Sequence, residues 1–276
     1  MMLDVNMRLI SMLGLLTGIV IIGLALDYLY IARRPVRWGL YVAIAGILCG
    51  VGLTLTAVLP ENNIYGRVFC QGDIKNKVVA LTFDDGPYPP YTEQILDILK
   101  ADDVKATFFI VGKNAAQHPD LVRRIFMEGH QIGNHTYHHI DLLKANRQTV
   151  IEELERTNDV LLSITGVKPH IVRPPHGFRD PVVLEVMAGL GLKVVEWSVM
   201  SRDWTNPGVE KIVNRTLDKI TNGSVVLLHD GDGIRSEASR AQTVAAVRLI
   251  IEHLKTEGYS FVTVDDILAN MKGVSR

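Results

Sequence analysis

Apolar positions follow two different patterns along the chain, one before and one after residue 60. The first sixty residues contain two long apolar runs, Leu9 to Leu26 and Leu40 to Leu59. Neither run shows the polar positions that a surface helix repeats about every 3.6 residues. From Pro60 onward, short apolar runs alternate with amphipathic stretches and polar turns. The pattern therefore predicts two regions with different surroundings.

The two long runs predict a membrane hairpin over residues 1–60, with spans at about 9–26 and 40–59, because a helix crosses a bilayer with about 20 apolar residues. The joining loop 31–37 carries three arginines, and such loops stay in the cytoplasm. We expect a multi-pass membrane protein whose following domain lies on the extracytoplasmic side. A signal peptide would have a shorter apolar region, and buried helices of a soluble domain would show polar faces.

After residue 76, seven apolar runs have the length of strands, and amphipathic stretches separate them. The runs are Val78–Phe83, Ala106–Val111, Gln131–Asn134, His170–Arg173, Lys193–Val199, Ser224–Leu228 and Phe261–Val264. The amphipathic stretches are Tyr91–Lys100, Pro119–Glu128, Val150–Thr165, Pro181–Leu190, Gly208–Thr221 and Ala238–Thr256. This alternation predicts an α/β layer or barrel of parallel strands over residues 77–276. The polar segment 61–76 is expected to be a stalk or covering loop.

Composition narrows the possible partners. The chain has 276 residues, of which 47% are hydrophobic and 21% charged, with a net charge of -1, so it reads as a folded protein without a nucleic-acid partner. Its two cysteines, Cys49 and Cys70, fall inside and outside the predicted membrane, which excludes a disulfide between them. Cys70 is either free or bridges two chains, so a homodimer stays open.

Unusual polar residues follow five of the predicted strands. They are Asp84 and Asp85, His135 to His139, Arg173, Asp203 and Trp204, and His229 and Asp230. In parallel α/β folds the carboxyl ends of the strands meet at one edge, where chemistry collects. The sequence therefore predicts that these five clusters share one site.

Two of these clusters have the side chains of a metal site. His135 and His139 lie four residues apart, a spacing that lets both imidazoles bind one ion. Hydrolytic zinc sites add a carboxylate to two histidines and leave a position for water. Gly86 and Pro87 end the preceding strand, so the chain can turn both acids inward. Taken alone, a histidine-rich loop or an Asp-Asp-Gly-Pro run is more typical of a solvated loop or surface turn.

Five motifs occur in order, "TFDDGP", "HTYHH", "RPPHG", "RDW" and "LLHD". With them the chain resembles the polysaccharide deacetylase family, also called carbohydrate esterase family 4 or the NodB-like domain, from Lys77 to the C-terminal helix. The resemblance implies an α/β fold, a distorted (β/α) barrel with about seven strands. It also implies metal-dependent removal of N-acetyl groups, with Zn²⁺ as the usual ion and Co²⁺ or Ni²⁺ as alternatives.

The same resemblance implies a role for each site residue. The catalytic residues would be Asp84 (base), His229 (acid), Arg173 and Asp203, the metal ligands Asp85, His135 and His139, and the substrate-binding residues Pro175, His176, Trp204 and Leu227. Arg173 would hydrogen-bond Asp84, and Asp203 would raise the pKa of His229 so that it stays protonated. His138 would be a structural imidazole.

The sequence departs from the family at two positions that bear on substrate choice. His176 stands where most members have an aromatic residue, and Met200 stands where many have an aspartate. We expect N-acetylglucosamine of cell-wall peptidoglycan as the substrate, with chitooligosaccharide or acetylxylan as alternatives. A membrane-anchored carbohydrate-binding protein without turnover would not need both a base and an acid. A glycoside hydrolase would leave the histidines unexplained.

Overall fold

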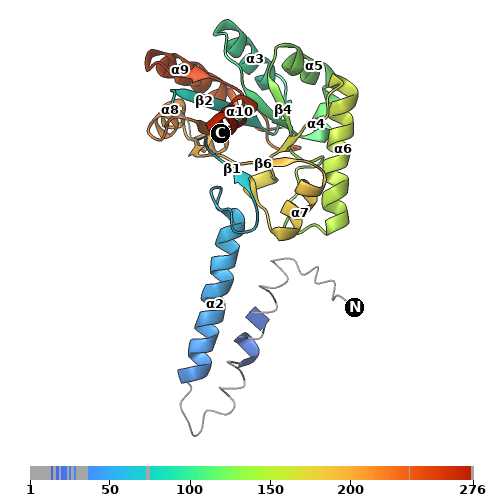
Figure 1. The fold of residues 1–276 in the computed structure, drawn as a ribbon, viewed down its shortest axis with the longest axis vertical. Helices are drawn as coiled ribbons and strands as arrows, with labels where there is room; N and C mark the ends of the chain where they lie inside the picture. Colours follow the sequence, from blue (N-terminus) through green and yellow to red (C-terminus); the bar gives the residue numbers. More distant parts are fainter. Residues whose placement is uncertain are drawn as a thin grey trace.

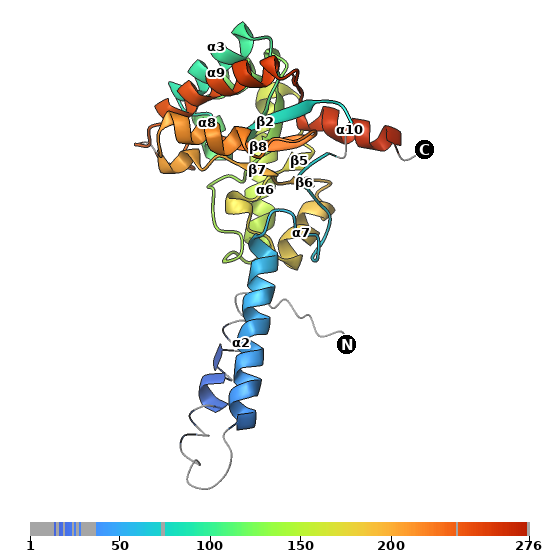
Figure 2. The ribbon, with the colours of Figure 1, turned by 90° about the vertical axis from the view of Figure 1, so that its left-hand side faces the viewer.

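A long N-terminal helix precedes an α/β domain in the computed structural model of the chain (Figure 1). The structure describes residues 37–72, 75–235 and 237–274, together with residues 14, 17, 18, 20–23, 25 and 28. Helix α2 (Arg37–Val58) extends from the end of the domain opposite to helices α3 and α9 (Figure 2).

One sheet of parallel strands forms the centre of the domain. Its strands are β1 (Val68–Phe69), β2 (Val78–Asp84), β3 (Thr107–Ile110), β4 (Gln131–Asn134), β5 (Ile171–Val172), β6 (Lys193–Val195), β7 (Val199–Met200), β8 (Ser224–His229) and β9 (Ser260–Phe261). Their order is β1-β6-β5-β4-β3-β2-β8-β7, and β9 pairs with the first residues of β2. All these pairs are parallel, so the carboxyl ends of the strands meet at one edge.

Helices cover the outside of the curved sheet (Figure 1). They are α3 (Tyr91–Ala101), α4 (Gly112–Gln117), α5 (Pro119–Met127), α6 (Arg147–Thr165), α7 (Pro181–Gly189), α8 (Val209–Leu217), α9 (Ala241–Thr256) and α10 (Val264–Val274), with short 3-10 helices η1 (Pro175–Gly177) and η2 (Asp203–Thr205). The boundaries of α6 follow local chemistry. The Asn146 side chain accepts a hydrogen bond from the backbone N–H of Thr149, and Gly166 ends the helix with φ of 77°.

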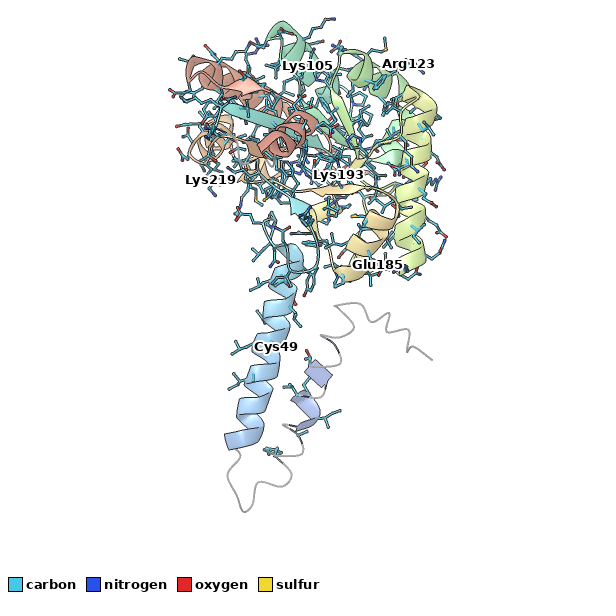
Figure 3. All side chains as sticks on the ribbon, viewed as in Figure 1. Cys49, Lys105, Arg123, Glu185, Lys193 and Lys219 are labelled. Atoms are coloured by element: carbon cyan, nitrogen blue, oxygen red, sulfur yellow. The ribbon has the colours of Figure 1, made fainter. Side chains whose placement is uncertain are left out.

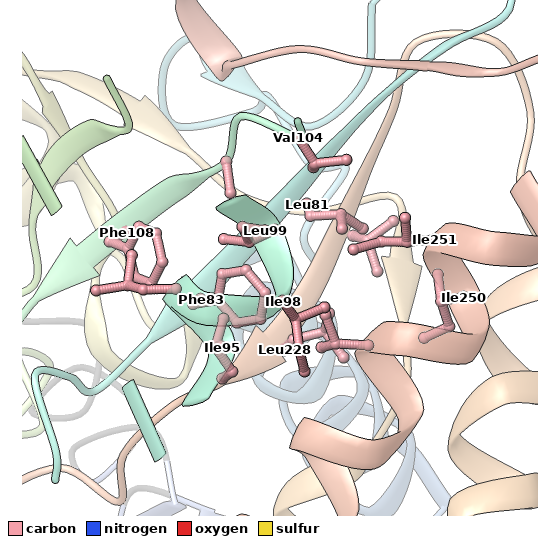
Figure 4. Packing of buried hydrophobic residues seen from close by; sticks show 14 of the residues in the cluster. Leu81, Phe83, Ile95, Ile98, Leu99, Val104, Phe108, Leu228, Ile250 and Ile251 are labelled. Atoms are coloured by element: carbon pink, nitrogen blue, oxygen red, sulfur yellow. The ribbon is translucent and has the colours of Figure 1, made fainter. Parts of the chain in front are cut away.

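Side chains alternate along the central strand β2, and this alternation separates the core from the site. Leu81 and Phe83 point outward into the hydrophobic core, where they pack with residues of α3 and α9 such as Ile95 and Ile250 (Figure 4). Thr82 and Asp84 point to the opposite face because successive side chains of a strand alternate. Burial of the outward face fixes the register, and with it the direction of Asp84.

The prediction of an α/β fold with parallel strands is confirmed, but the predicted count of about seven strands was too low. The predicted run Lys193–Val199 is two strands, because the chain changes pairing partner within it. Glu196 donates its backbone N–H to Phe69 of β1, whereas Ser198 donates to Val225 of β8. Strand β1 itself lies inside the segment 61–76 predicted as a stalk or covering loop, and its two residues pair with β6.

The part of the chain that the structure describes does not show the two-helix transmembrane hairpin predicted over residues 1–60. The first predicted span, 9–26, lies mostly outside the described residues, as does the loop 31–37 apart from Arg37. The second predicted span, 40–59, corresponds to α2, whose last turn contacts protein: Ala57 is buried, and its carbonyl accepts the backbone N–H of Arg179 at 3.0 Å. Within the part of the chain that the structure describes, no helix is long and apolar enough to cross a membrane.

Candidate active site

The two adjacent acids at the end of β2 reach the site in different ways. Asp84 faces inward by the normal alternation of the strand. Asp85 has a φ of 79°, so the chain already turns at this residue and its carboxylate also faces the site. The sequence had assigned this turn to Gly86 and Pro87. Gly86 has another function: a Cβ there would lie 2.0 Å from Oδ2 of Asp230, whose Oδ1 accepts the N–H of Gly86.

Arg173 fixes the orientation of Asp84. Its Nη1 donates to Asp84 Oδ1 at 2.7 Å and to the hydroxyl of Thr82 at 2.8 Å. Its Nε and Nη2 donate to the backbone carbonyls of Val195 and Glu196, and the whole side chain is buried. A buried ion pair keeps its geometry when its remaining donors are satisfied in this way. The predicted contact between Arg173 and Asp84 is therefore present.

Asp85, His135 and His139 meet at one point. The Nε2 atoms of His135 and His139 lie 3.3 and 3.1 Å from Asp85 Oδ1. Two ligands of one tetrahedral zinc ion, each about 2.0–2.1 Å from the metal, would lie about 3.3 Å apart. Asp85 Oδ1 is buried without a hydrogen bond of good geometry, as expected for an atom that binds an ion. The three side chains fit a divalent metal.

Charge and backbone contacts prepare these groups as ligands. Burial alone would raise the pKa of Asp85, but the imidazoles of His135 and His139 outweigh it and hold that pKa well below its usual value. The Nδ1 of His135 lies 2.7 Å from the carbonyl oxygen of Arg173. Donation from Nδ1 leaves the lone pair of Nε2 directed at the metal position, a common arrangement around metal-binding histidines.

Glu153 of α6 holds the histidine loop in place. One carboxylate oxygen accepts the backbone N–H groups of Tyr137 and His138, and the other lies 2.7 Å from Nδ1 of His138. His138 therefore fixes the loop, as the sequence had suggested. Nothing in the sequence pattern pointed to Glu153, because it lies mid-helix among other charged residues.

His229 and Asp203 form a second imidazole–carboxylate pair at the end of β8, the strand next to β2; Asp203 is fully buried and the His229 side chain is 13% exposed. Nδ1 of His229 lies 2.9 Å from Asp203 Oδ1, and the backbone N–H of His229 donates to Asp203 Oδ2 at 2.8 Å. Burial favours the neutral imidazole, but the charge and hydrogen bond of Asp203 outweigh it and raise the pKa of His229 to about 9. His229 is therefore a proton donor at neutral pH.

The metal-site residues and His229 line one cavity of about 620 Å³. Its walls include both acids, the metal-site histidines and His229, and Arg235 and Ile234 lie at its mouth. Three of the four predicted substrate-binding residues line it, His176, Trp204 and Leu227, whereas Pro175 lies buried in η1 outside this wall. Trp204 is 37% exposed, and its ring lies 5.1 Å from that of His229.

Several residues that position the site carried no signal in the sequence. The hydroxyls of Ser201 and Thr243 both donate to Asp203, although Thr243 lies on α9, forty residues away in the chain. The amide of Asn114 donates to the carbonyls of Asp85 and Gly233. Such contacts depend on tertiary packing and have no local pattern.

Comparison with known proteins agrees with this geometry. The family model described as polysaccharide deacetylase matches residues 71–195. A peptidoglycan-N-acetylglucosamine deacetylase of Bacillus cereus is 43% identical over 202 residues, which cover 70% of this chain and 88% of that protein. A chitooligosaccharide deacetylase of Sinorhizobium fredii is 40% identical over 187 residues, which cover 66% and 87% of the two chains.

A solved structure shows the same fold. The crystal structure of the Bc1960 peptidoglycan N-acetylglucosamine deacetylase superimposes with a TM-score of 0.69 at 38% sequence identity. The match covers 72% of this chain and 92% of the other. The likeness therefore extends over nearly the whole of that protein.

Proposed function

This chain belongs to the polysaccharide deacetylase family, a family of hydrolases, and on that premise we propose that it removes N-acetyl groups from N-acetylglucosamine in cell-wall peptidoglycan. The observation that carries the proposal is the meeting of a carboxylate, a protonated imidazole and a three-residue metal site around one cavity. Water and the amide would react to give acetate and a free amine.

We propose a divalent metal, Zn²⁺ first and Co²⁺ or Ni²⁺ as alternatives, bound by Asp85, His135 and His139. Two imidazole nitrogens and one carboxylate oxygen are ligands that suit these ions, and three protein ligands leave a position open. When bound, the ion supplies a Lewis acid that polarises a carbonyl and makes water more acidic.

Asp84 is the proposed general base. Its carboxylate lies at the cavity wall, next to the metal site, with Oδ2 3.8 Å from Nε2 of His135. Arg173 occupies Oδ1, which leaves Oδ2 as the oxygen that takes the proton of the attacking water. Because Arg173 fixes the Asp84 carboxylate, Oδ2 approaches the attacking water in a single orientation.

His229 is the proposed general acid. It delivers its proton to the amide nitrogen as the bond to the acetyl carbon breaks, so the sugar leaves as a neutral amine. Asp203 orients the ring through Nδ1, which leaves the proton on Nε2 for transfer. After the reaction His229 is neutral and Asp84 is protonated, and exchange with solvent restores both groups.

The remaining cavity residues would hold the substrate. Leu227 is a small apolar surface beside His229 and suits the acetyl methyl group. Trp204, exposed next to the acid, suits stacking against a sugar ring. The backbone N–H of His176 is the proposed donor to the oxyanion, a role that follows from the family resemblance.

Two substrates have support from relatives, and we propose the first. The Bacillus cereus relative is named for peptidoglycan N-acetylglucosamine, and the Sinorhizobium fredii relative for chitooligosaccharide. Both polymers present the same N-acetylglucosamine unit to the cavity, so the groups around that unit must decide between them. Acetylxylan, an ester substrate, stays an alternative that follows from the family resemblance.

Acetate release tests the reaction, and together with metal content it distinguishes the roles of the two acids at the end of β2. The purified protein is incubated with peptidoglycan, chitooligomers or acetylated xylan, with Zn²⁺, Co²⁺ or Ni²⁺ supplied. We expect Asp84→Asn to lower kcat by about 10²–10⁴-fold with metal content unchanged, because only the base is lost. Asp85→Asn should lose bound metal together with activity. The exposed Lys193→Ala is the control.

Two outcomes would contradict the proposal. If Asp84→Asn kept full turnover, another group would be the base. If the wild-type protein released acetate from none of the substrates with any of the metals, it would be a carbohydrate-binding protein without turnover.

We propose an extracytoplasmic location for the domain. It is supported by a cell-wall polymer as the proposed substrate and by relatives that are named for peptidoglycan N-acetylglucosamine. Protease added to sealed protoplasts should digest the domain, and a cytoplasmic marker protein should survive in the same sample. Complete protection of the domain would place it in the cytoplasm.

A further inference from the structure

A second cavity, of about 490 Å³, adjoins the catalytic one. Trp197 and Met200 line both cavities, so the two hollows meet at these side chains. The far wall of the second cavity is the segment that follows α2, Leu59–Asn62, and its near wall consists of Trp197, Ser198, Met200, Arg202 and Lys219. A polymer whose acetylated unit lies in the first cavity could therefore extend a neighbouring unit into the second.

The far wall has a fixed position. Nη2 of Arg179, a buried side chain, donates to the carbonyls of Leu59, Pro60 and Asn62 at 2.6, 3.0 and 3.1 Å. The same guanidinium also donates to Gly177 in the loop that carries His176. One buried cation thus holds the wall of the second cavity against a loop of the first.

The second cavity carries two cations. Arg202 and Lys219 line it and are exposed, and the ion pairs of the described residues include neither of them. Glu61, on the opposite wall, is the carboxylate of the same cavity. At the junction, Met200 is neutral, so no acid there repels a negative group that passes from one cavity to the next. The positive side chains therefore favour an anionic group on the neighbouring unit.

We propose that the second cavity is a subsite for the sugar next to the acetylated glucosamine, and that Arg202 and Lys219 there select polymers in which this sugar carries a carboxylate. On peptidoglycan the muramic acid unit carries such a charge in one of two ways: a free lactyl carboxylate where no peptide is attached, or the carboxylates of the stem peptide where the lactyl group is amide-linked to it. Chitooligosaccharide is neutral. The inference rests on the proposed function, because it concerns the same deacetylation. It adds a reason for the choice of polymer.

A matched pair of substrates isolates the charge. The first is an oligosaccharide of alternating N-acetylglucosamine and N-acetylmuramic acid with free lactyl carboxylates, and the second is the same oligosaccharide with those carboxylates converted to methyl amides. We expect the wild-type protein to show a kcat/KM about fivefold or more higher for the charged form. Salt should reduce this ratio, because it screens exposed charges.

The variant Lys219→Ala combined with Arg202→Gln should bring the ratio of charged to neutral kcat/KM close to one and remove its dependence on salt. Lys193→Ala is the matched control: this lysine is also exposed, but it lies on β6 outside both cavities (Figure 3). It should keep the wild-type ratio.

The outcomes separate this inference from the proposed function. If neither oligosaccharide nor peptidoglycan releases acetate, the proposed function fails. If both oligosaccharides react and the ratio is the same in the wild type and in the double variant, deacetylation stands and the charged subsite is refuted. A loss of activity on both forms by the same factor would also refute it, since that result indicates a structural defect rather than lost selection.

Discussion

The contact between His229 and Asp203 sets the pH range in which the site can donate a proton. Burial favours the neutral imidazole, yet the adjacent carboxylate raises the pKa of His229 to about 9. A group with a raised pKa keeps its proton at neutral pH and loses it as the pH rises through the raised value. The acid form is therefore available at neutral pH, and activity should fall on the alkaline side.

Asp203→Asn is expected to move the alkaline limb of kcat/KM to lower pH by one unit or more, because the charge that opposes burial is removed. At neutral pH the rate should fall more than about tenfold, since less of the imidazole is protonated and its orientation is lost. The pH profile of acetate release measures both effects.

Ser201→Ala is the control for this change. It removes one hydrogen bond to Asp203 Oδ1 but keeps the charge, so the alkaline limb should shift much less. An unchanged limb in Asp203→Asn would show that another group is the acid.

Individual site residues were predictable from the sequence when a motif carried them. The predicted acids, histidines and Arg173 do meet at one edge of the sheet. The residues that orient them, such as Glu153 and Thr243, were not predictable, because each acts from a helix through a tertiary contact. Periodicity in the sequence predicts local structure, but it does not predict contacts between residues that are distant in the chain.

At the scale of elements, the turn after β2 sets the positions of the two acids of the site. The carbonyl of Asp84 accepts the backbone N–H of Asp230, and Asp230 in turn accepts the N–H of Gly86 and the hydroxyl of Thr92 from α3. Burial raises the pKa of Asp230 to about 7. The end of β8 and the start of α3 therefore clamp the turn that presents Asp84 and Asp85.

Gly86→Ala is expected to lower the free energy of unfolding by about 1–3 kcal/mol, because the added methyl group overlaps the Asp230 carboxylate and the packed turn must shift. Metal affinity should fall as well, since Asp85 precedes the altered residue. Chemical denaturation and metal titration measure the two effects.

Gly189→Ala, at the end of α7, is the matched control. Nothing lies within 4 Å of its added Cβ, so stability should stay the same or rise by up to about 1 kcal/mol. If Gly86→Ala also left the free energy of unfolding unchanged, the turn would have room for a methyl group and the predicted close packing against Asp230 would be wrong.

The elements themselves were partly predictable. The run Gln131–Asn134 is strand β4 with the predicted limits, because a buried strand between two turns has a clear local signature. The change of partner between β6 and β7 had no such signature, since it depends on which neighbour offers a carbonyl. The two-residue strand β1 is too short for any alternation to show.

For the whole molecule, sheet order explains why distant motifs converge. Strand β2 lies between β3 and β8, so the motif near residue 84 and the motif near residue 229 are neighbours although about half the chain separates them. Parallel pairing of Asp84 with His229 puts base and acid at the same level. Alternation of strands and helices predicted this class of fold but did not give the order of the strands.

The contact of Arg179 with the segment after α2 limits where the catalytic domain can be joined to a different N-terminal segment. The match to the family model begins at residue 71, yet three acceptors of this buried guanidinium belong to residues 59–62. Recombination that joined a foreign leader at residue 71 would transfer the motifs but remove the segment Leu59–Asn62, and the buried guanidinium of Arg179 would lose three acceptors. A chain that keeps this contact must therefore begin before Leu59.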